Sequence, residues 1–102
     1  MNGKGNAYSN DAQQRLLRLI DRLIGHEVSG INAIDLASMI DASQPTVYRD
    51  LKNLEEAGWA EQLPDGRWRI CVNAARLLRR INDGIAAALT KVNEARRTYQ
   101  EF

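Results

Sequence analysis

The chain has 102 residues, which is the size of one domain and leaves little room for a second. Its apolar fraction of 44% and charged fraction of 26% are ordinary for a soluble globular protein, and its apolar stretches are too short for a membrane span. Because the net charge is only +1, it does not favour binding of nucleic acid, and such a function would depend on where individual cations point and not on the total charge.

The amino end, residues 1–10, is rich in Gly, Asn and Ser, which is typical of a disordered arm. An amphipathic helix is predicted from Asp11 to Ile24, because leucine and isoleucine recur there at helical spacing. Asn10 or Asp11 is available as its cap, and Gly25 as its stop.

A second, short helix is predicted over residues 33–40, with Asn32 as its cap. Its small residue Ala37 stands where a third helix would cross it. The turn that follows needs a residue that tolerates positive φ. This position is usually glycine, and here Asp41 or Ala42 must take it.

A third helix is predicted from Ser43, its cap, to Ala57, with Pro45 in its first turn and Gly58 as its stop. Its inward face is set by apolar residues at i, i+4 and i+7, which are Val47, Leu51 and Leu54. The polar residues opposite that stripe and on its flanks are Gln44, Thr46, Tyr48, Arg49, Lys52 and Asn53.

The residues that follow predict a β-hairpin, with strands over 59–63 and 67–72. The turn sequence Pro64-Asp65-Gly66 supplies a fixed φ, a turn-tolerant Asp and a Gly for the left-handed position. Trp59 and Trp68 share the inward phase and are expected to pack the hairpin onto the helices. Three helices followed by such a hairpin define a winged helix-turn-helix domain, mainly α with a small β wing (α+β), over residues 11–72.

The third helix of such a domain fits the major groove of duplex DNA, which is about 12 Å wide. Arg49 is the first candidate for base reading because arginine pairs bidentately with guanine, and Gln44 and Thr46 come next. The alternative is that these residues are solvated side chains on an exposed helix. The predicted DNA contacts on this helix are Ser43, Gln44, Thr46, Tyr48, Arg49, Lys52 and Asn53.

The stretch from Ser43 to Ile70, SQPTVYRDLKNLEEAGWAEQLPDGRWRI, closely resembles the amino-terminal winged-helix domain of the IclR family of bacterial transcription regulators. With the first two helices, the similarity covers about two-thirds of the chain. The matching residues are Pro45-Thr46-Val47-Tyr48-Arg49, Leu51, Leu54, Glu55-Glu56-Ala57-Gly58 and the wing Pro64-Asp65-Gly66-Arg67-Trp68.

The resemblance implies that the third helix enters the major groove, with Thr46, Tyr48 and Arg49 as contacts, and that the wing reaches the backbone or the minor groove. It also implies a bacterial or phage origin. An IclR regulator continues into a larger effector-binding domain, whereas this chain ends first. We therefore expect a stand-alone DNA-binding unit with no small-molecule effector domain and no cofactor.

Two arginines of the predicted wing, Arg67 and Arg69, share the exposed face of its second strand. Arginine beside a tight turn suits a narrow minor groove or a phosphate. The alternative, given equal weight, is that cross-strand partners such as Glu61 neutralise them as ordinary surface pairs.

A long final helix is predicted over residues 73–102, capped by Asn73. Its apolar residues alternate steps of four and three, which is a heptad pattern. A seam this narrow favours pairing with the same helix of a second chain, giving a two-fold homodimer through a coiled coil, although folding back over the chain's first helix is an alternative. The pattern leaves the direction of pairing open. The seam consists of Ala74, Leu78, Ile81, Ile85, Ala88, Val92, Ala95, Tyr99 and Phe102.

Two further basic groups lie on helices. Arg76, Arg79 and Arg80 fall off the seam at the start of the last helix, where they could clamp phosphates or simply be solvated. The first helix carries a second basic stripe, with a weaker case, made of Arg15, Arg18 and Arg22.

The sequence thus predicts a cytoplasmic, double-stranded-DNA-binding transcriptional regulator, favoured to be a repressor acting by steric occlusion. As a homodimer it would read a palindrome with half-sites about one helical turn, or a multiple, apart. The alternative is a winged-helix protein-interaction module in a larger assembly, which the near-neutral charge suits. Gln44 and Arg49 discriminate the two, since DNA binding needs them in open solvent and an interaction module places them in an apolar patch.

An enzyme is not expected. The single histidine, His26, stands beside the glycine that ends the first helix, and Asp35 and Asp41 belong to no metal-ligand pattern. Cys71, the only cysteine, has no histidine near it in sequence and excludes an internal disulfide, which favours a reducing cytoplasm.

Overall fold

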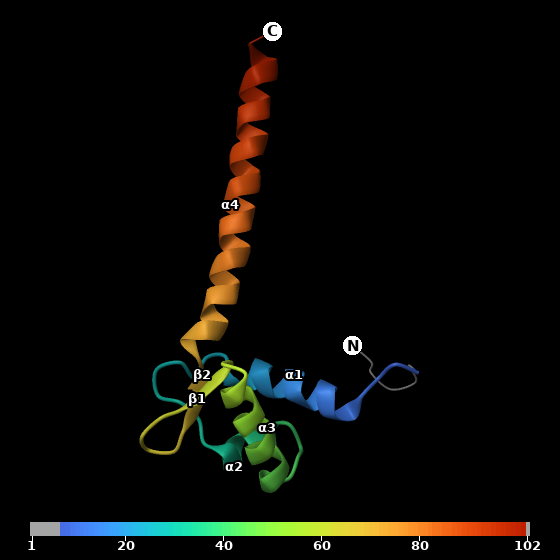
Figure 1. Cartoon of the computed structure of the whole chain (residues 1–102), viewed down its shortest axis with the longest axis vertical. Helices are drawn as coiled ribbons and strands as arrows, with labels where there is room; N and C mark the ends of the chain where they lie inside the picture. Colours follow the sequence, from blue (N-terminus) through green and yellow to red (C-terminus); the bar gives the residue numbers. More distant parts are fainter. Residues whose placement is uncertain (1–6, 102) are drawn as a thin grey trace.

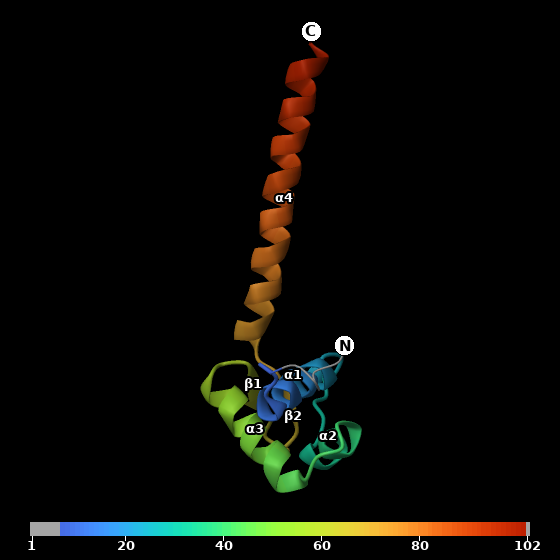
Figure 2. The same cartoon turned by 90° about the vertical axis from the view of Figure 1, so that its right-hand side faces the viewer.

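The computed structural model describes residues 7–101, which form a head and a long helical stem. The stem, residues 72–100, leaves one side of the head, residues 11–71, and projects away from it (Figures 1 and 2). Of the disordered arm expected over residues 1–10, residues 1–6 lie outside the described part of the chain. The elements are α1 (Asp11–Leu23), α2 (Ala33–Met39), α3 (Gln44–Glu56), β1 (Ala60–Gln62), β2 (Trp68–Ile70) and α4 (Val72–Gln100).

The first three helices begin at side-chain caps that the sequence predicted. The Asn10 side chain accepts from the Gln13 amide at 3.0 Å, and Asn32 accepts from the Asp35 amide at 2.8 Å. The Ser43 hydroxyl accepts from the Thr46 amide at 3.3 Å. Each bond satisfies an amide that has no partner within its own helix, which fixes where the helix starts.

The helix ends differ slightly from the prediction. α1 stops at Leu23 and not at Ile24, whose backbone is extended and whose side chain is 62% exposed. α2 likewise ends one residue early, at Met39. In the turn between α2 and α3, Asp41 is the residue that takes positive φ, at 54°. Gly58 follows α3 with φ of 82°, as expected of a helix-ending glycine.

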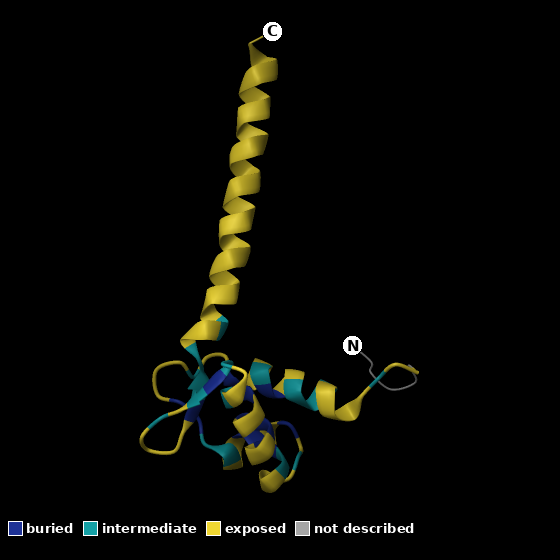
Figure 3. Ribbon diagram, viewed as in Figure 1, coloured by how far each residue is buried: buried dark blue, intermediate teal, exposed yellow. Residues whose placement is uncertain are grey.

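The core lies where α1, α2, α3 and the hairpin meet (Figure 3). Val47 and Leu51 are fully buried and Leu54 nearly so, which confirms the predicted inward stripe of α3. Trp68 is 1% exposed and Trp59 packs against the same core, so both tryptophans hold the hairpin onto the helices.

The two strands are antiparallel, with Glu61 opposite Arg69, and both are shorter than predicted. Gly66 has φ of 92°, which confirms the left-handed position in the turn. The sheet has a third, single-residue member that the sequence did not predict. Ile31 exchanges two backbone hydrogen bonds with Trp68, both 2.8 Å long, and so fastens the segment between α1 and α2 to the wing.

The start of α4 corrects two predictions. Val72 belongs to the helix and not to the second strand, and Cys71 occupies the cap position that we expected for Asn73. Asn73 lies in the first turn, where its side-chain oxygen accepts from Arg76 at 3.1 Å. The Cys71 amide donates to the Trp59 carbonyl at 2.9 Å, which ties the foot of the stem to the head.

The stem is exposed along almost its whole length, with Ala74 near its foot partly buried (Figure 3). None of its residues is buried, and its axis leads away from α1 (Figure 1). The alternative that the last helix folds back over α1 is therefore wrong. Within residues 7–101, no helix combines the length and the apolar character that a membrane crossing requires.

Candidate nucleic-acid interface

α3 presents one polar surface to solvent because its opposite side is locked into the core. Fully buried Val47 and Leu51 hold one side of the helix against the core. Thr46 is half-buried at the margin of this surface. The predicted contacts on α3 that are exposed are Gln44, Tyr48, Arg49, Lys52 and Asn53, together with the cap residue Ser43.

Three of these side chains form a small group at the amino end of α3. The Ser43 hydroxyl donates to the Thr46 hydroxyl at 2.8 Å, and an Arg49 terminal nitrogen donates to the same oxygen at 3.5 Å. The second distance is at the limit of a hydrogen bond. The Arg49 guanidinium is therefore directed by Thr46 but retains donors for another acceptor.

The far end of α3 is less suited to an anion. Lys52 donates to Glu55 at 2.8 Å, and this hydrogen bond raises the pKa of the Lys52 ammonium above its ordinary value. Lys52 thus stays cationic, but Glu55 offsets much of its charge, and Glu56 adds a negative charge beside it. An anionic ligand is favoured at the amino-terminal half of α3, where the helix dipole is also positive.

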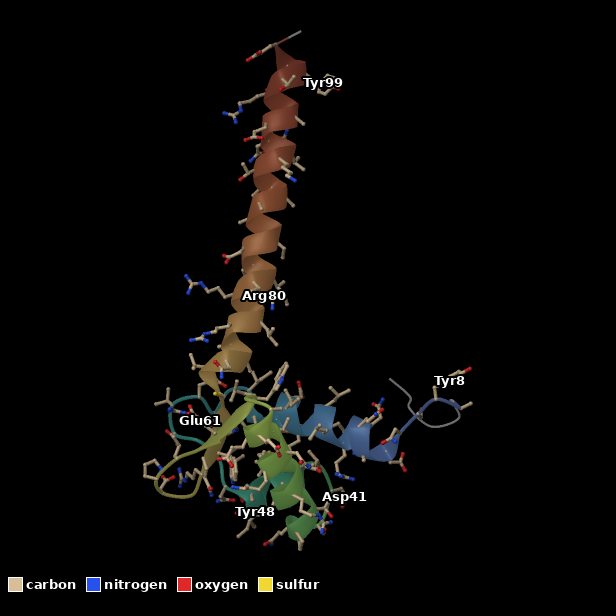
Figure 4. All side chains as sticks on the ribbon, in the orientation of Figure 1. Tyr8, Asp41, Tyr48, Glu61, Arg80 and Tyr99 are labelled. Atoms are coloured by element: carbon tan, nitrogen blue, oxygen red, sulfur yellow. The ribbon has the colours of Figure 1, made fainter. Side chains whose placement is uncertain are left out.

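Tyr48 lies between this surface and the wing. Its ring meets the buried Trp68 ring edge-on, with centroids 6.3 Å apart, while 48% of Tyr48 remains exposed. In Figure 4, Tyr48 lies at the end of the head that is opposite the stem. The exposed face of α3 and the wing are thus held in one arrangement by a packed aromatic pair.

The two wing arginines have different surroundings. Arg69 donates to Glu61 at 2.9 Å and to the Glu27 carbonyl at 3.2 Å, so it joins both strands to the loop that precedes Ile31. Arg67 lies at the hairpin turn with half of its side chain exposed, and its Nε is 4.0 Å from Asp65 Oδ2, the outer limit of an ion pair. Of the two, Arg67 is the one available to a ligand.

The arginines of the stem lie apart from these groups. Arg76, Arg79 and Arg80 are exposed, and Figure 4 places Arg80 on the stem, on the other side of the head from Tyr48. The geometry therefore separates the predicted phosphate clamp from the surface of α3.

One interaction of the head was not predicted. Arg15, which the sequence grouped with Arg18 and Arg22, donates from Nε and Nη2 to the two carboxylate oxygens of Asp50, at 2.6 and 3.1 Å. This pair joins α1 to α3. The available signal was that Asp50 directly precedes Leu51, next to the inward stripe, where an isolated carboxylate needs a partner.

Between 7 and 101, no three His, Cys, Asp or Glu side chains gather in a way that could hold a metal ion. His26 takes part in the turn after α1 through its backbone, where its amide donates to the Leu23 carbonyl and its carbonyl accepts from the Gly30 amide.

Three helices, a helix-turn-helix crossing and a hairpin wing make the head a winged helix-turn-helix domain. The model of the IclR helix-turn-helix domain matches residues 14–64, half of the chain, and the chain belongs to this family. It is accordingly a DNA-binding regulatory domain. The search of curated proteins found no match.

A solved structure shares the fold. It is that of Cyprinid Herpesvirus3 ORF112-Zalpha, described in its binding mode to Z-DNA. The two chains are 22% identical with a TM-score of 0.52, and the alignment covers 57% of this chain and 93% of that chain. A likeness at this identity concerns the fold alone, and it agrees with the winged-helix architecture of the head.

Proposed function

We propose that the chain is a sequence-specific regulator of transcription that binds double-stranded DNA as a homodimer at a palindromic site. The observation that carries this proposal is that α3 is buried on one side and exposed on the other. Val47 and Leu51 are fully buried, while Gln44 and Arg49 on the same helix lie in open solvent. This exposure is what base reading needs, and it favours DNA over a protein partner docked on an apolar patch.

The amino-terminal half of α3 is proposed to enter the major groove. Arg49 would pair with the two acceptors of a guanine, Gln44 with an adenine, and Thr46 with a phosphate or a thymine methyl group. Tyr48 would contact the backbone between the helix and the wing, and Arg67 would reach a phosphate or the minor groove. Arg69 is held by Glu61, so we assign it no direct contact.

The stem, residues 72–100, is proposed to be the dimerisation element. Its seam residues Leu78, Ile81 and Ile85 are each about 60% exposed in the single chain, and a second copy of the helix would cover them. Two heads related by a two-fold axis read inverted half-sites, which is why we expect a palindrome. A dimer seated on a promoter would block other proteins, so repression by occlusion is the simplest mode of action.

The decisive experiment is selection of bound sequences from a random pool of duplexes at moderate salt, with the full chain and with Arg49→Ala. We expect the wild type to enrich an inverted repeat and the variant to lose it. Arg18→Ala is the matched control, because it removes the same charge from an exposed position on α1. Absence of any enriched sequence with the wild-type chain would contradict sequence-specific binding and favour the interaction module.

A further inference from the structure

Asp50 is the one charged residue that is buried among residues 7–101, with 7% of its surface exposed. It lies on α3, and both of its carboxylate oxygens are bound by the guanidinium of Arg15 on α1. The Arg15 side chain is itself only 25% exposed. The hydrogen bond to Asp50 raises the pKa of the Arg15 guanidinium above its ordinary value, so Arg15 stays cationic.

Such a pair adds little to stability but restricts the relative orientation of the two helices that it joins. Removing two charges from water costs about as much as their attraction returns, so a buried pair adds little net free energy. A two-pronged bond between planar groups, however, allows only one relative orientation. The apolar contacts of Val47 and Leu51 are non-directional, whereas the bond from Arg15 fixes the rotation of α3 about its axis.

The position of Asp50 connects that rotation to the DNA surface. Asp50 follows Arg49 directly and stands four residues after Thr46, so it shares a flank of α3 with Thr46. A rotation that released Asp50 would therefore move Arg49 and Thr46 in relation to the groove.

We infer that Arg15 and Asp50 are positioning residues for base reading, which hold the recognition surface of α3 at the angle that a specific site requires. They touch no base themselves. This inference rests on the proposed function and adds a determinant of specificity that lies behind the recognition helix. It predicts that breaking the pair lowers discrimination between DNA sequences more than it lowers binding to DNA in general.

The test compares the wild type with Arg15→Gln, Asp50→Asn and Arg15→Lys. Each is titrated against the selected palindrome and against a scrambled duplex of the same length, at one salt concentration and well below the unfolding temperature. We expect Arg15→Gln and Asp50→Asn to bind the palindrome about tenfold more weakly, roughly the discrimination of one base contact, with little change on the scrambled duplex. Arg15→Lys keeps the charge but loses the two-pronged hydrogen bond to Asp50. Its affinity for the palindrome is therefore expected to lie between those of the wild type and Arg15→Gln.

Arg18→Gln is the matched control, an equal loss of charge at an exposed site on the same helix, and should leave the ratio of the two affinities unchanged. A merely structural role would lower both affinities together with the folded fraction. If Asp50→Asn does not fold, Arg15→Lys decides. An unchanged ratio in the folded variants overturns the inference, whereas a wild-type chain that selects no sequence overturns the proposed function first.

Discussion

Tyr48 and Trp68 meet edge to face, with ring centroids 6.3 Å apart and ring planes at 81°. Trp68 is buried in the core and its backbone is hydrogen-bonded to that of Ile31, so it is a fixed support. Tyr48 is half exposed on α3. The contact therefore positions a side chain of the candidate DNA surface against the sheet. The Tyr48 ring makes this contact, whereas the Tyr48 hydroxyl is proposed to contact DNA, so the two roles can be tested independently.

The ring and the hydroxyl of Tyr48 are expected to act on different quantities. Tyr48→Ala removes the ring contact and should lower the free energy of unfolding by about 1 kcal/mol, while Tyr48→Phe keeps that contact and the stability. Loss of the hydroxyl in Tyr48→Phe should weaken binding of the palindrome by about fivefold, the value of one hydrogen bond. Urea denaturation and fluorescence anisotropy measure the two effects. Equal stability of Tyr48→Ala and the wild type would contradict the supporting role of the ring.

Elements of the head were predictable where the determining chemistry is local. The caps Asn32 and Ser43 act on amides three residues away, and Gly58 and Gly66 take backbone angles that most residues avoid. The inward stripe of α3 follows from helical periodicity alone. These signals sit within a few neighbouring residues, so the order of elements and the exposed face of α3 could be derived before the structure.

What the sequence could not show depends on partners far along the chain. Arg15 and Asp50 are 35 positions apart, and the residues around either one do not indicate that the other is its partner. Ile31 pairs with Trp68 through its backbone alone, and a single residue carries no strand periodicity. The error at Asn73 has a different cause, because this good capping residue stands two positions after Cys71, the residue that occupies the cap.

The wing arginines offer a test with opposite outcomes. Arg67→Ala should weaken binding to all duplexes alike and lower the slope of log affinity against log salt by about 1, with no change in stability, because one phosphate contact is lost. Arg69→Ala should instead lower the free energy of unfolding by about 0.5–1 kcal/mol, because Glu61 and the Glu27 carbonyl lose their donor. Salt titrations and thermal melts of both variants distinguish the cases. A reduced salt slope in Arg69→Ala would restore that residue to the DNA surface.

Two glycines should respond to alanine in opposite directions. Gly30 has φ of 73°, and a Cβ there would lie 2.8 Å from Leu63 Cδ1 and 2.9 Å from Arg67 Cβ. Gly30→Ala is therefore expected to destabilise the head by about 2 kcal/mol through strain and overpacking. Gly84 lies within α4, and apart from the adjoining residues and backbone of its own helix nothing lies within 4 Å of an added Cβ, so Gly84→Ala should stabilise the stem helix by about 1 kcal/mol. Denaturation followed by circular dichroism reports both changes, and a stable Gly30→Ala head would show that the loop can move.

The stem provides the test of dimerisation. Ile85 is on the seam and 63% exposed in the single chain, so in a paired stem it would lie against the other helix. Ile85→Glu places a charge in each half of that seam and should raise the dimer dissociation constant by at least about 100-fold, since burial of one isoleucine contributes about 1.5–3 kcal/mol per chain. The melting of the head should not change, because no stem residue is buried.

Asn93→Glu, off the seam on the same helix, is the control. Sedimentation equilibrium should show dimers for the wild type and control and monomers for Ile85→Glu. In DNA titrations, Ile85→Glu should bind the palindrome more weakly than the wild type but bind a single half-site equally well. Dimers of Ile85→Glu would exclude this seam as the interface, and a monomeric wild type would exclude the paired stem.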